Sequence, residues 1–107
     1  MKNILLAFSL VITAACFAQT SNNQTLTKIA FGSCANQEKP EEIFFKIAEQ
    51  QPQLFIFLGD NIYGDTQDMN VLQAKYNQLA AKPGYQKLLA TTPVIATWDD
   101  RDFGVDD

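Results

Sequence analysis

The feature that most constrains the fold is an apolar run from Leu54 to Leu58, which is followed directly by Gly59 and Asp60. Five apolar residues without a polar break are typical of a strand buried on both faces, as in a parallel sheet covered by helices. In such sheets, ligands bind beyond the carboxyl ends of the strands. The run therefore predicts that Asp60 lies where a bound ion or substrate would lie, although an acidic solvated turn fits the same residues.

The sequence around this run predicts a strand–helix–strand arrangement. Strands are expected over residues 27–31, 54–58 and 94–97, and helices from Pro40 to before Pro52, from Asp68 to before Lys82 and over residues 85–90. Apolar residues recur at helical spacing in the longer helical segments, and Asp68 is a suitable N-cap. Crossover connections of this kind are right-handed and make the strands parallel. The predicted fold class is therefore α/β.

Residues 1–18 have the pattern of a signal peptide. Lys2 provides a short positive region, and residues 4–17 form an apolar stretch that is too short to span a bilayer stably. Cys16 and Ala18 occupy the two positions where signal peptidase requires small residues. We therefore expect cleavage after Ala18, export to the periplasm or beyond, and no transmembrane segment in the mature chain.

An alternative interpretation of this leader is a lipoprotein signal in which Cys16 is acylated. Thr13 makes this alternative less favoured, because a leucine is usual at that position. Residues 19–26 are polar and are expected to form a flexible lead-in. The folded part is then expected to cover residues 27–107. Because a three-stranded sheet is thin and would expose apolar faces, we expect this part to be the N-terminal portion of a larger domain.

The charge pattern and the residue types exclude several classes of function. The chain has a formal net charge of −4 and no run of basic residues, so no nucleic-acid-binding patch is expected. It contains no histidine, so neither a Ser-His-Asp nor a Cys-His catalytic arrangement can be completed within it. Glycine-rich loops of the Walker and Rossmann types do not occur in it either.

Chemically active side chains follow each of the three predicted strands. These residues are Cys34 after the first strand, Asp60 and Tyr63 after the second, and Asp99 and Asp100 after the third. Carboxylates gathered at one edge repel each other and raise each other's pKa unless a cation neutralises them. Oxygen ligands suit calcium, magnesium or manganese, whereas a thiolate or phenolate suits iron or zinc. The pattern predicts a cation site, and two cations there would clamp a phosphate and activate a water.

Three segments together resemble the start of the alkaline phosphatase D (PhoD-like) metallophosphatases. They are Ile-Ala-Phe-Gly-Ser-Cys at residues 29–34, Leu-Gly-Asp-Asn-Ile-Tyr at 58–63, and Ala-Thr-Trp-Asp-Asp-Arg-Asp-Phe-Gly-Val-Asp-Asp at 96–107. The resemblance implies a calcineurin-like αββα sandwich, of which only the N-terminal βαβ-type part falls in this chain. It also implies hydrolysis of phosphate mono- or diesters outside the cytoplasm, with iron and calcium as metals and a phosphate ester as substrate.

The resemblance assigns five metal ligands, which are Cys34, Asp60, Tyr63, Asp99 and Asp100. One position departs from the family pattern, because Arg101 stands where the motif Trp-Asp-Asp-His-Asp has its histidine. By analogy with related enzymes, that histidine would contact phosphate and assist the leaving group. Arginine retains a positive charge for phosphate but cannot donate its proton near neutral pH. The catalytic role of position 101 is therefore in doubt.

Three functional hypotheses follow from these residues. The leading one is a metal-dependent phosphoesterase that is present as its N-terminal portion. The second is a non-catalytic fragment or degenerate paralogue that at most binds a metal. The third is an extracellular interaction module that uses its exposed apolar edge.

Individual residues also have plainer structural interpretations. Cys34 fits an inert core thiol, and Tyr63 fits a packing residue. Trp98 is expected to belong to the core beneath the site. Asp102 and the two terminal aspartates are expected to be solvated.

Overall fold

The computed structural model describes residues 23–105, so the predicted signal peptide and its cleavage site lie outside the described residues. The elements in chain order are β1 (Ile29–Gly32), α1 (Ile43–Glu49), β2 (Leu54–Phe57), α2 (Met69–Ala80), α3 (Pro83–Thr91), β3 (Val94–Ala96) and the short 3₁₀ helix η1 (Asp100–Asp102). The predicted order of strands and helices is confirmed, and so is the α/β class.

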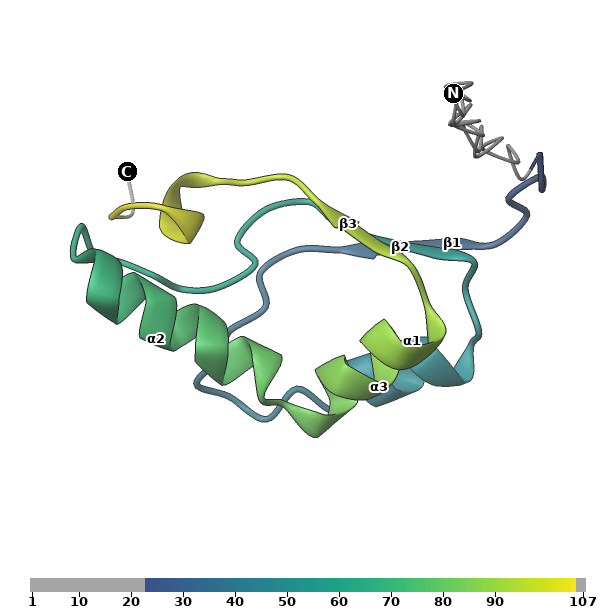
Figure 1. Cartoon of the computed structure of the whole chain (residues 1–107), viewed down its shortest axis with the longest axis horizontal. Helices are drawn as coiled ribbons and strands as arrows, with labels where there is room; N and C mark the ends of the chain where they lie inside the picture. The colour runs from purple at the N-terminus through teal and green to yellow at the C-terminus, as the bar shows by residue number, and fades with distance from the viewer. Residues whose placement is uncertain (1–22, 106–107) are drawn as a thin grey trace, which may run out of the picture.

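The three strands form one parallel sheet with the order β1-β2-β3. In the register, Phe31 lies beside Ile56, and Ile56 lies beside Ile95. Figure 1 shows all three helices on the same side of this sheet. Two right-handed crossovers that advance in the same direction across a sheet place their helices on one face, which agrees with this arrangement.

The core lies between the sheet and the helices α1 and α3. Phe55 and Phe57 point from β2 into this layer, where Phe44 and Leu88 meet them, and all four side chains are at least 96% buried. The rings are packed edge-on or tilted, with centroids 4.9 Å apart for Phe55 and Phe57 and 6.0 Å apart for Phe44 and Phe57. Aromatic pairs favour such geometry, so these rings stabilise the layer beyond the burial of their apolar surface.

The prediction that residues 54–58 are buried on both faces is wrong. Phe55 and Phe57 are buried, but Leu54 and Ile56 are only half-buried and Leu58 is 49% exposed. Successive side chains of a strand point to opposite faces, and within residues 23–105 the helices cover only one of them. The uncovered face also exposes Ile29, Phe31 and Ile95. An unbroken apolar run therefore identifies the strand but not what covers each face.

Two predicted helix starts differ from those in the structure, and the strands predicted over residues 27–31, 54–58 and 94–97 are found at Ile29–Gly32, Leu54–Phe57 and Val94–Ala96. α1 begins at Ile43 rather than at Pro40, because the preceding residues form tighter turns in which Phe44 N–H donates to the Glu41 carbonyl at 3.3 Å. α3 begins at Pro83, two residues before the predicted start, and its proline suits the first turn of a helix. Small shifts of this kind are normal at helix ends.

The predicted N-cap of α2 is confirmed. The Asp68 carboxylate accepts a hydrogen bond from the Asn70 N–H at 2.8 Å.

The prediction that Trp98 lies in the core is wrong. Its side chain is 73% exposed, because β3 ends at Ala96 and the chain leaves the helix layer there. In the described part of the chain, no helix is both long and apolar enough to cross a membrane.

Candidate metal centre

The loops that follow the three strands meet at one edge of the sheet. Figure 1 shows them, together with η1, on the side of the molecule that the carboxyl ends of the strands face. The Cys34 N–H donates to the Gly59 carbonyl at 3.3 Å, and the Ala35 N–H donates to the Asp60 carbonyl at 2.9 Å. The Thr97 N–H donates to the Phe57 carbonyl at 3.0 Å. The parallel sheet therefore brings the predicted residues to a common edge.

Three aspartates form a cluster at this edge, which we call the carboxylate cluster: Asp60, Asp99 and Asp100. One carboxylate oxygen from each lies within 4.8 Å of the others. Asp99 is exposed, whereas Asp60 and Asp100 are half-buried. Clustered carboxylate oxygens are the ligands that divalent cations prefer, so this group could hold such an ion.

Asp60 has an unusual environment within the cluster. Its Oδ2 accepts a hydrogen bond from the Cys34 thiol at 3.6 Å, whereas its Oδ1 is buried and receives no hydrogen bond from residues 23–105. Burial raises the pKa of the Asp60 carboxyl, the Cys34 hydrogen bond opposes this, and repulsion from Asp99 and Asp100 adds to it. A cation at the cluster would give the buried oxygen a partner and offset the repulsion, so the donor set fits a metal ion.

Gly59 permits the close approach between two of these loops. Its φ is +106°, and a Cβ placed on it would lie 2.8 Å from the Cβ of Asp99. Only glycine combines this backbone conformation with the absence of a side chain. The loop after β2 can therefore lie directly against Asp99.

Tyr63 is positioned through its backbone by a buried glutamine. The Gln37 side chain is fully buried, accepts a hydrogen bond from the Tyr63 N–H at 2.7 Å and donates one to the Tyr63 carbonyl at 3.2 Å. Lys75 donates a further hydrogen bond to the same carbonyl at 2.9 Å. Burial raises the pKa of the Tyr63 phenol, Cys34 and Asp60 raise it further, and Arg101 opposes the rise.

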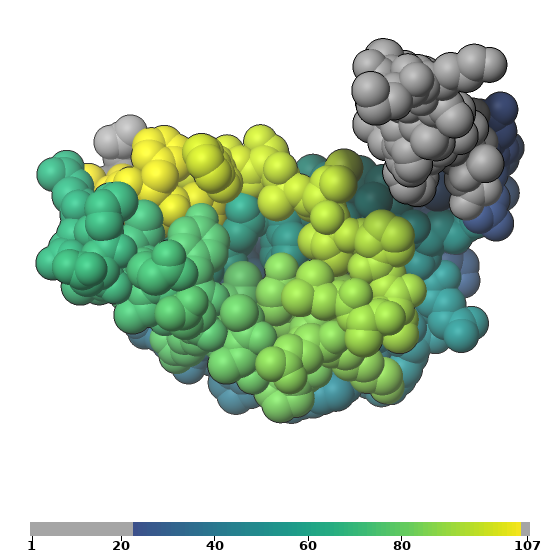
Figure 2. Space-filling view, in the orientation of Figure 1, coloured from purple at the N-terminus to yellow at the C-terminus, as the bar shows by residue number. Residues whose placement is uncertain are grey.

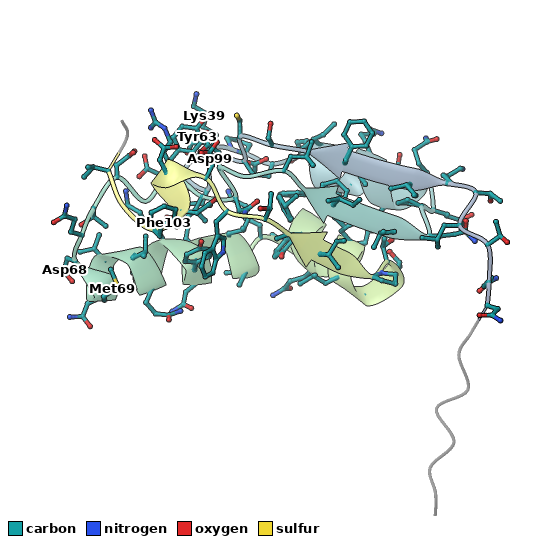
Figure 3. All side chains as sticks on the ribbon, turned by 90° about the horizontal axis from the view of Figure 1, so that it is seen from above. Lys39, Tyr63, Asp68, Met69, Asp99 and Phe103 are labelled. Carbon is teal, nitrogen blue, oxygen red and sulfur yellow. The ribbon has the colours of Figure 1, made fainter. Side chains whose placement is uncertain are left out.

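Arg101 lies over the ring of Tyr63 at the same edge. The carbon of its guanidinium is 4.6 Å from the ring centroid, and its Nη1 is 3.1 Å from each carboxylate oxygen of Asp65. Figure 3 looks down on the sheet and labels Tyr63 and Asp99 at this end of the molecule. The structure thus places the side chain at position 101 next to Tyr63, with an acidic partner.

Two buried residues of the site were not identified from the sequence. Gln37 belongs to no motif, and a single glutamine in a loop gives no signal of burial. Asp102 was expected to be solvated, but it is only 2% exposed. Its carboxylate accepts hydrogen bonds from the backbone of the loop after β2, about forty positions earlier in the chain, so no local signal could show its burial.

The carboxylate cluster lies outside the hollow beside α2 and α3. Figure 2 shows the surface hollowed between β3, α2 and α3, where a cavity of about 470 Å³ is lined in part by Tyr76, Tyr85 and Trp98. The three aspartates of the carboxylate cluster do not line this cavity. One member of the cluster, Asp99, is exposed to solvent.

Comparisons with known proteins give one informative similarity. No protein-family model matches the chain, and a search of curated proteins finds no significant match. A solved structure described as "Structure of PhoD" matches with a TM-score of 0.65 and 19% sequence identity. The match covers 74% of this chain and 19% of that protein, so this chain corresponds to about a fifth of its length. At this identity, the match shows that the chain is structurally similar to part of PhoD.

Proposed function

We propose that this chain carries the cation-binding edge of a PhoD-like, metal-dependent phosphoesterase that hydrolyses phosphate mono- or diesters. The fold shared with part of PhoD is the premise of the proposal. The observation that carries it is the carboxylate cluster, in which the three aspartates bring oxygens within 4.8 Å of one another at the carboxyl edge of a parallel sheet. Such edges are where α/β folds bind their ligands.

Asp60, Asp99 and Asp100 are the proposed oxygen ligands, and Cys34 and Tyr63 complete the proposed set. The buried, unpartnered Oδ1 of Asp60 supports its assignment. The contact between Cys34 and Asp60 supports the inclusion of the thiol. When bound, a metal ion supplies charge for a phosphate and lowers the pKa of a coordinated water. Carboxylates suit calcium and a thiol or phenol suits iron, so we propose iron and calcium as the natural metals.

Arg101 is the proposed phosphate contact. A guanidinium presents several N–H donors in a plane, which matches the oxygens of a phosphate group. Its position over Tyr63 brings this charge to the edge where the carboxylate cluster lies. Asp65 is bound to the same guanidinium and would compete with a phosphate for it.

A second candidate function is cation and phosphate binding without turnover. It is favoured by the arginine at position 101 and by the absence of histidine from the sequence. General acid–base catalysis typically contributes about 10²–10⁴-fold to a rate, and a guanidinium cannot supply it near neutral pH. We therefore expect hydrolysis by these 107 residues to be slow or undetectable.

Cation binding is the first test of the proposal. Calorimetric titration of the metal-free protein with Mn²⁺ or Ca²⁺ should show saturable binding. Asp60→Asn should abolish this binding while the fold persists. Asp68→Asn is a matched control, because the Asp68 carboxylate caps α2 by accepting from the Asn70 and Val71 N–H groups and is not a proposed ligand. Binding that is absent from the wild-type chain, or unchanged in Asp60→Asn, would contradict the proposed site.

Hydrolysis of an aryl phosphate diester separates the two candidates. The first predicts turnover that requires iron and calcium, whereas the second predicts metal-dependent binding of inorganic phosphate without turnover. Arg101→His restores a possible proton donor, but we do not expect this change alone to produce rapid turnover in the 107-residue chain. Rapid, metal-dependent hydrolysis by the unmodified chain would show that a histidine at position 101 is not required.

Export is proposed as well, on the basis of residues 1–18. Mass spectrometry of the exported protein should give a mature chain that begins at Gln19. A diacylglycerol on Cys16 would instead support the lipoprotein alternative.

A further inference from the structure

Asp102 is a buried carboxylate that joins two of the loops at the carboxyl edge. Its Oδ1 accepts hydrogen bonds from the N–H groups of Asn61 at 2.6 Å and Ile62 at 3.1 Å. Its Oδ2 accepts from the Asp99 N–H at 2.9 Å and from the Asn61 side-chain amide at 3.3 Å. The side chain is 2% exposed, so these four donors replace water around the charge.

The two loops joined by Asp102 are the ones that carry the carboxylate cluster. Asn61 follows Asp60 directly, and Asp99 is itself a donor to the Asp102 carboxylate. One side chain therefore fixes the backbone on both sides of the cluster, although the loops are about forty residues apart in sequence. Asp102 is absent from the set of cluster oxygens that lie within 4.8 Å of one another, so it supports the cluster without belonging to it.

The chemistry of the four donors requires a carboxylate. An ionised carboxylate accepts hydrogen bonds at both oxygens and donates none. An asparagine of the same shape would turn an NH₂ group toward at least one of these N–H groups. A glutamate would retain the charge but would displace the carboxylate by one methylene, which a residue buried to this degree cannot accommodate without shifting the loops.

We propose that Asp102 is a positioning residue of the cation site, which sets the placement of Asp60 relative to Asp99 and Asp100. This inference rests on the cation site of the proposed function. Side chains that orient metal ligands typically change metal affinity by about 10–100-fold when they are replaced. Asp102 acts on the ligands through the backbone N–H groups that it holds.

The test compares Mn²⁺ affinity among three variants of the full chain by calorimetry. Asp102→Asn retains the shape of the side chain, and Asp102→Glu retains its charge. Both should weaken Mn²⁺ binding by about 10–100-fold. The control Asp68→Asn removes an equal charge from a helix cap and should leave the Mn²⁺ affinity close to that of the wild-type chain. Amide hydrogen exchange at Phe55 and Phe57 shows whether each variant retains the core.

The possible outcomes separate this inference from the proposed function. If the wild-type chain binds Mn²⁺ and Asp102→Glu binds it equally well, charge alone matters and the positioning role is overturned. If Asp102→Asn binds as well as the wild type, the carboxylate is purely structural and the inference fails. If the wild-type chain binds no Mn²⁺, the proposed cation site fails, and the positioning role fails with it.

A milder variant keeps the inference testable if both replacements of Asp102 unfold the protein. Asn61→Ala removes one of the four donors, together with the hydrogen bond of 2.8 Å that the same amide donates to the Thr97 carbonyl, and leaves the carboxylate in place. Because a hydrogen bond contributes about 0.5–1.5 kcal/mol, loss of the one to Asp102 should weaken Mn²⁺ binding by about 2- to 12-fold. Unchanged affinity in a folded Asn61→Ala protein would overturn the inference.

Discussion

The helix-covered face of the sheet and its carboxyl edge both contain fully buried side chains, but these differ in kind. Under the sheet, the fully buried residues are Phe44, Phe55 and Leu88. At the edge, they are the polar residues Gln37 and Asp102 and one apolar residue, Ile62. Apolar burial is non-directional and tolerates adjustment, whereas a buried polar group requires each of its hydrogen bonds. The core therefore stabilises the fold, and the edge fixes the positions of particular groups.

The same comparison holds for backbone strain and charge. Four residues in the edge loops have positive φ: Cys34 at 60°, Gly59 at 106°, Asp60 at 49° and Asp65 at 48°. Non-glycine residues in this region cost free energy and are often found at functional sites. Burial raises the pKa of Asp60, and the mutual repulsion within the carboxylate cluster raises it further. The edge thus reduces stability that the core provides, as is common where a site is prepared for a ligand.

The largest effect is expected in the core. Phe44→Ala should lower the free energy of unfolding by about 3–5 kcal/mol, because it removes a ring that is 98% buried and contacts Phe57 and Tyr85. Phe31→Ala is the matched control, since Phe31 lies on the uncovered face of the sheet and is 69% exposed. Its loss should change stability by about 0.5 kcal/mol or less. Urea unfolding measures both, and equal losses would contradict the contrast between the two faces.

A smaller loss of stability is expected from the edge backbone. Gly59→Ala should cost about 1–3 kcal/mol, because it forces a side chain onto a residue with φ +106° and against Asp99. It should also weaken cation binding, because Asp99 must move away. Gly104→Ala is the control, since its added Cβ would meet only the Asp100 carbonyl at an ordinary 3.6 Å. A Gly59→Ala protein with wild-type stability and cation affinity would show that the close approach is unimportant.

Charge at the edge gives a third and weaker effect, which acts on binding. Asp65→Asn removes an anion that competes with phosphate for Arg101, so phosphate affinity should rise by up to about fivefold, the scale of a partly exposed ion pair. Calorimetric titration with inorganic phosphate in the presence of the cation measures this. A lower phosphate affinity in Asp65→Asn would show that Asp65 orients Arg101 for phosphate.

The fold could be predicted from the sequence because its signals are local. The apolar run at residues 54–58 identified β2, and Asp68 identified the start of α2, which the structure confirms. The coverage of the sheet could not be predicted, because it depends on which face the crossovers occupy. For the same reason, Trp98 and Leu58 were placed in the interior but are exposed.

The candidate site was only partly accessible from the sequence. Asp60, Asp99 and Asp100 follow strand ends, and parallel strands bring such ends together, so their cluster was expected. Gln37 and Asp102 act through hydrogen bonds to the backbone of residues 61–63, far away in the sequence. Gln37 lies in no motif, and although Asp102 is the last residue of the Trp-Asp-Asp-Arg-Asp segment, the local pattern does not show that it is buried. The ligand candidates were thus predictable, whereas the residues that position them required the structure.

Tyr76 contacts both the core and the carboxyl edge, and its replacement is expected to have the smallest effect. Its ring packs against the core, and its hydroxyl donates a hydrogen bond of 2.9 Å to the Asp102 carbonyl. Tyr76→Phe removes only that hydrogen bond, so at neutral pH it should cost about 1 kcal/mol or less, measured by urea unfolding. A loss of several kcal/mol would mean that the edge contributes to stability on the same scale as the core.

The stability difference between the wild type and Tyr76→Phe should depend on pH, whereas a change in packing alone would not make it do so. Burial, with a contribution from the Asp102 charge, raises the pKa of Tyr76 from its ordinary value of 10 to about 12. As the pH rises above 10, the unfolded chain releases this proton while the folded chain retains it up to about pH 12. The unfolded state is therefore favoured progressively across this interval. The free energy of unfolding of the wild-type chain should therefore fall more steeply between pH 10 and 12 than that of Tyr76→Phe. Parallel curves of unfolding free energy against pH for the two proteins would show that the Tyr76 hydroxyl is not held at the edge as described.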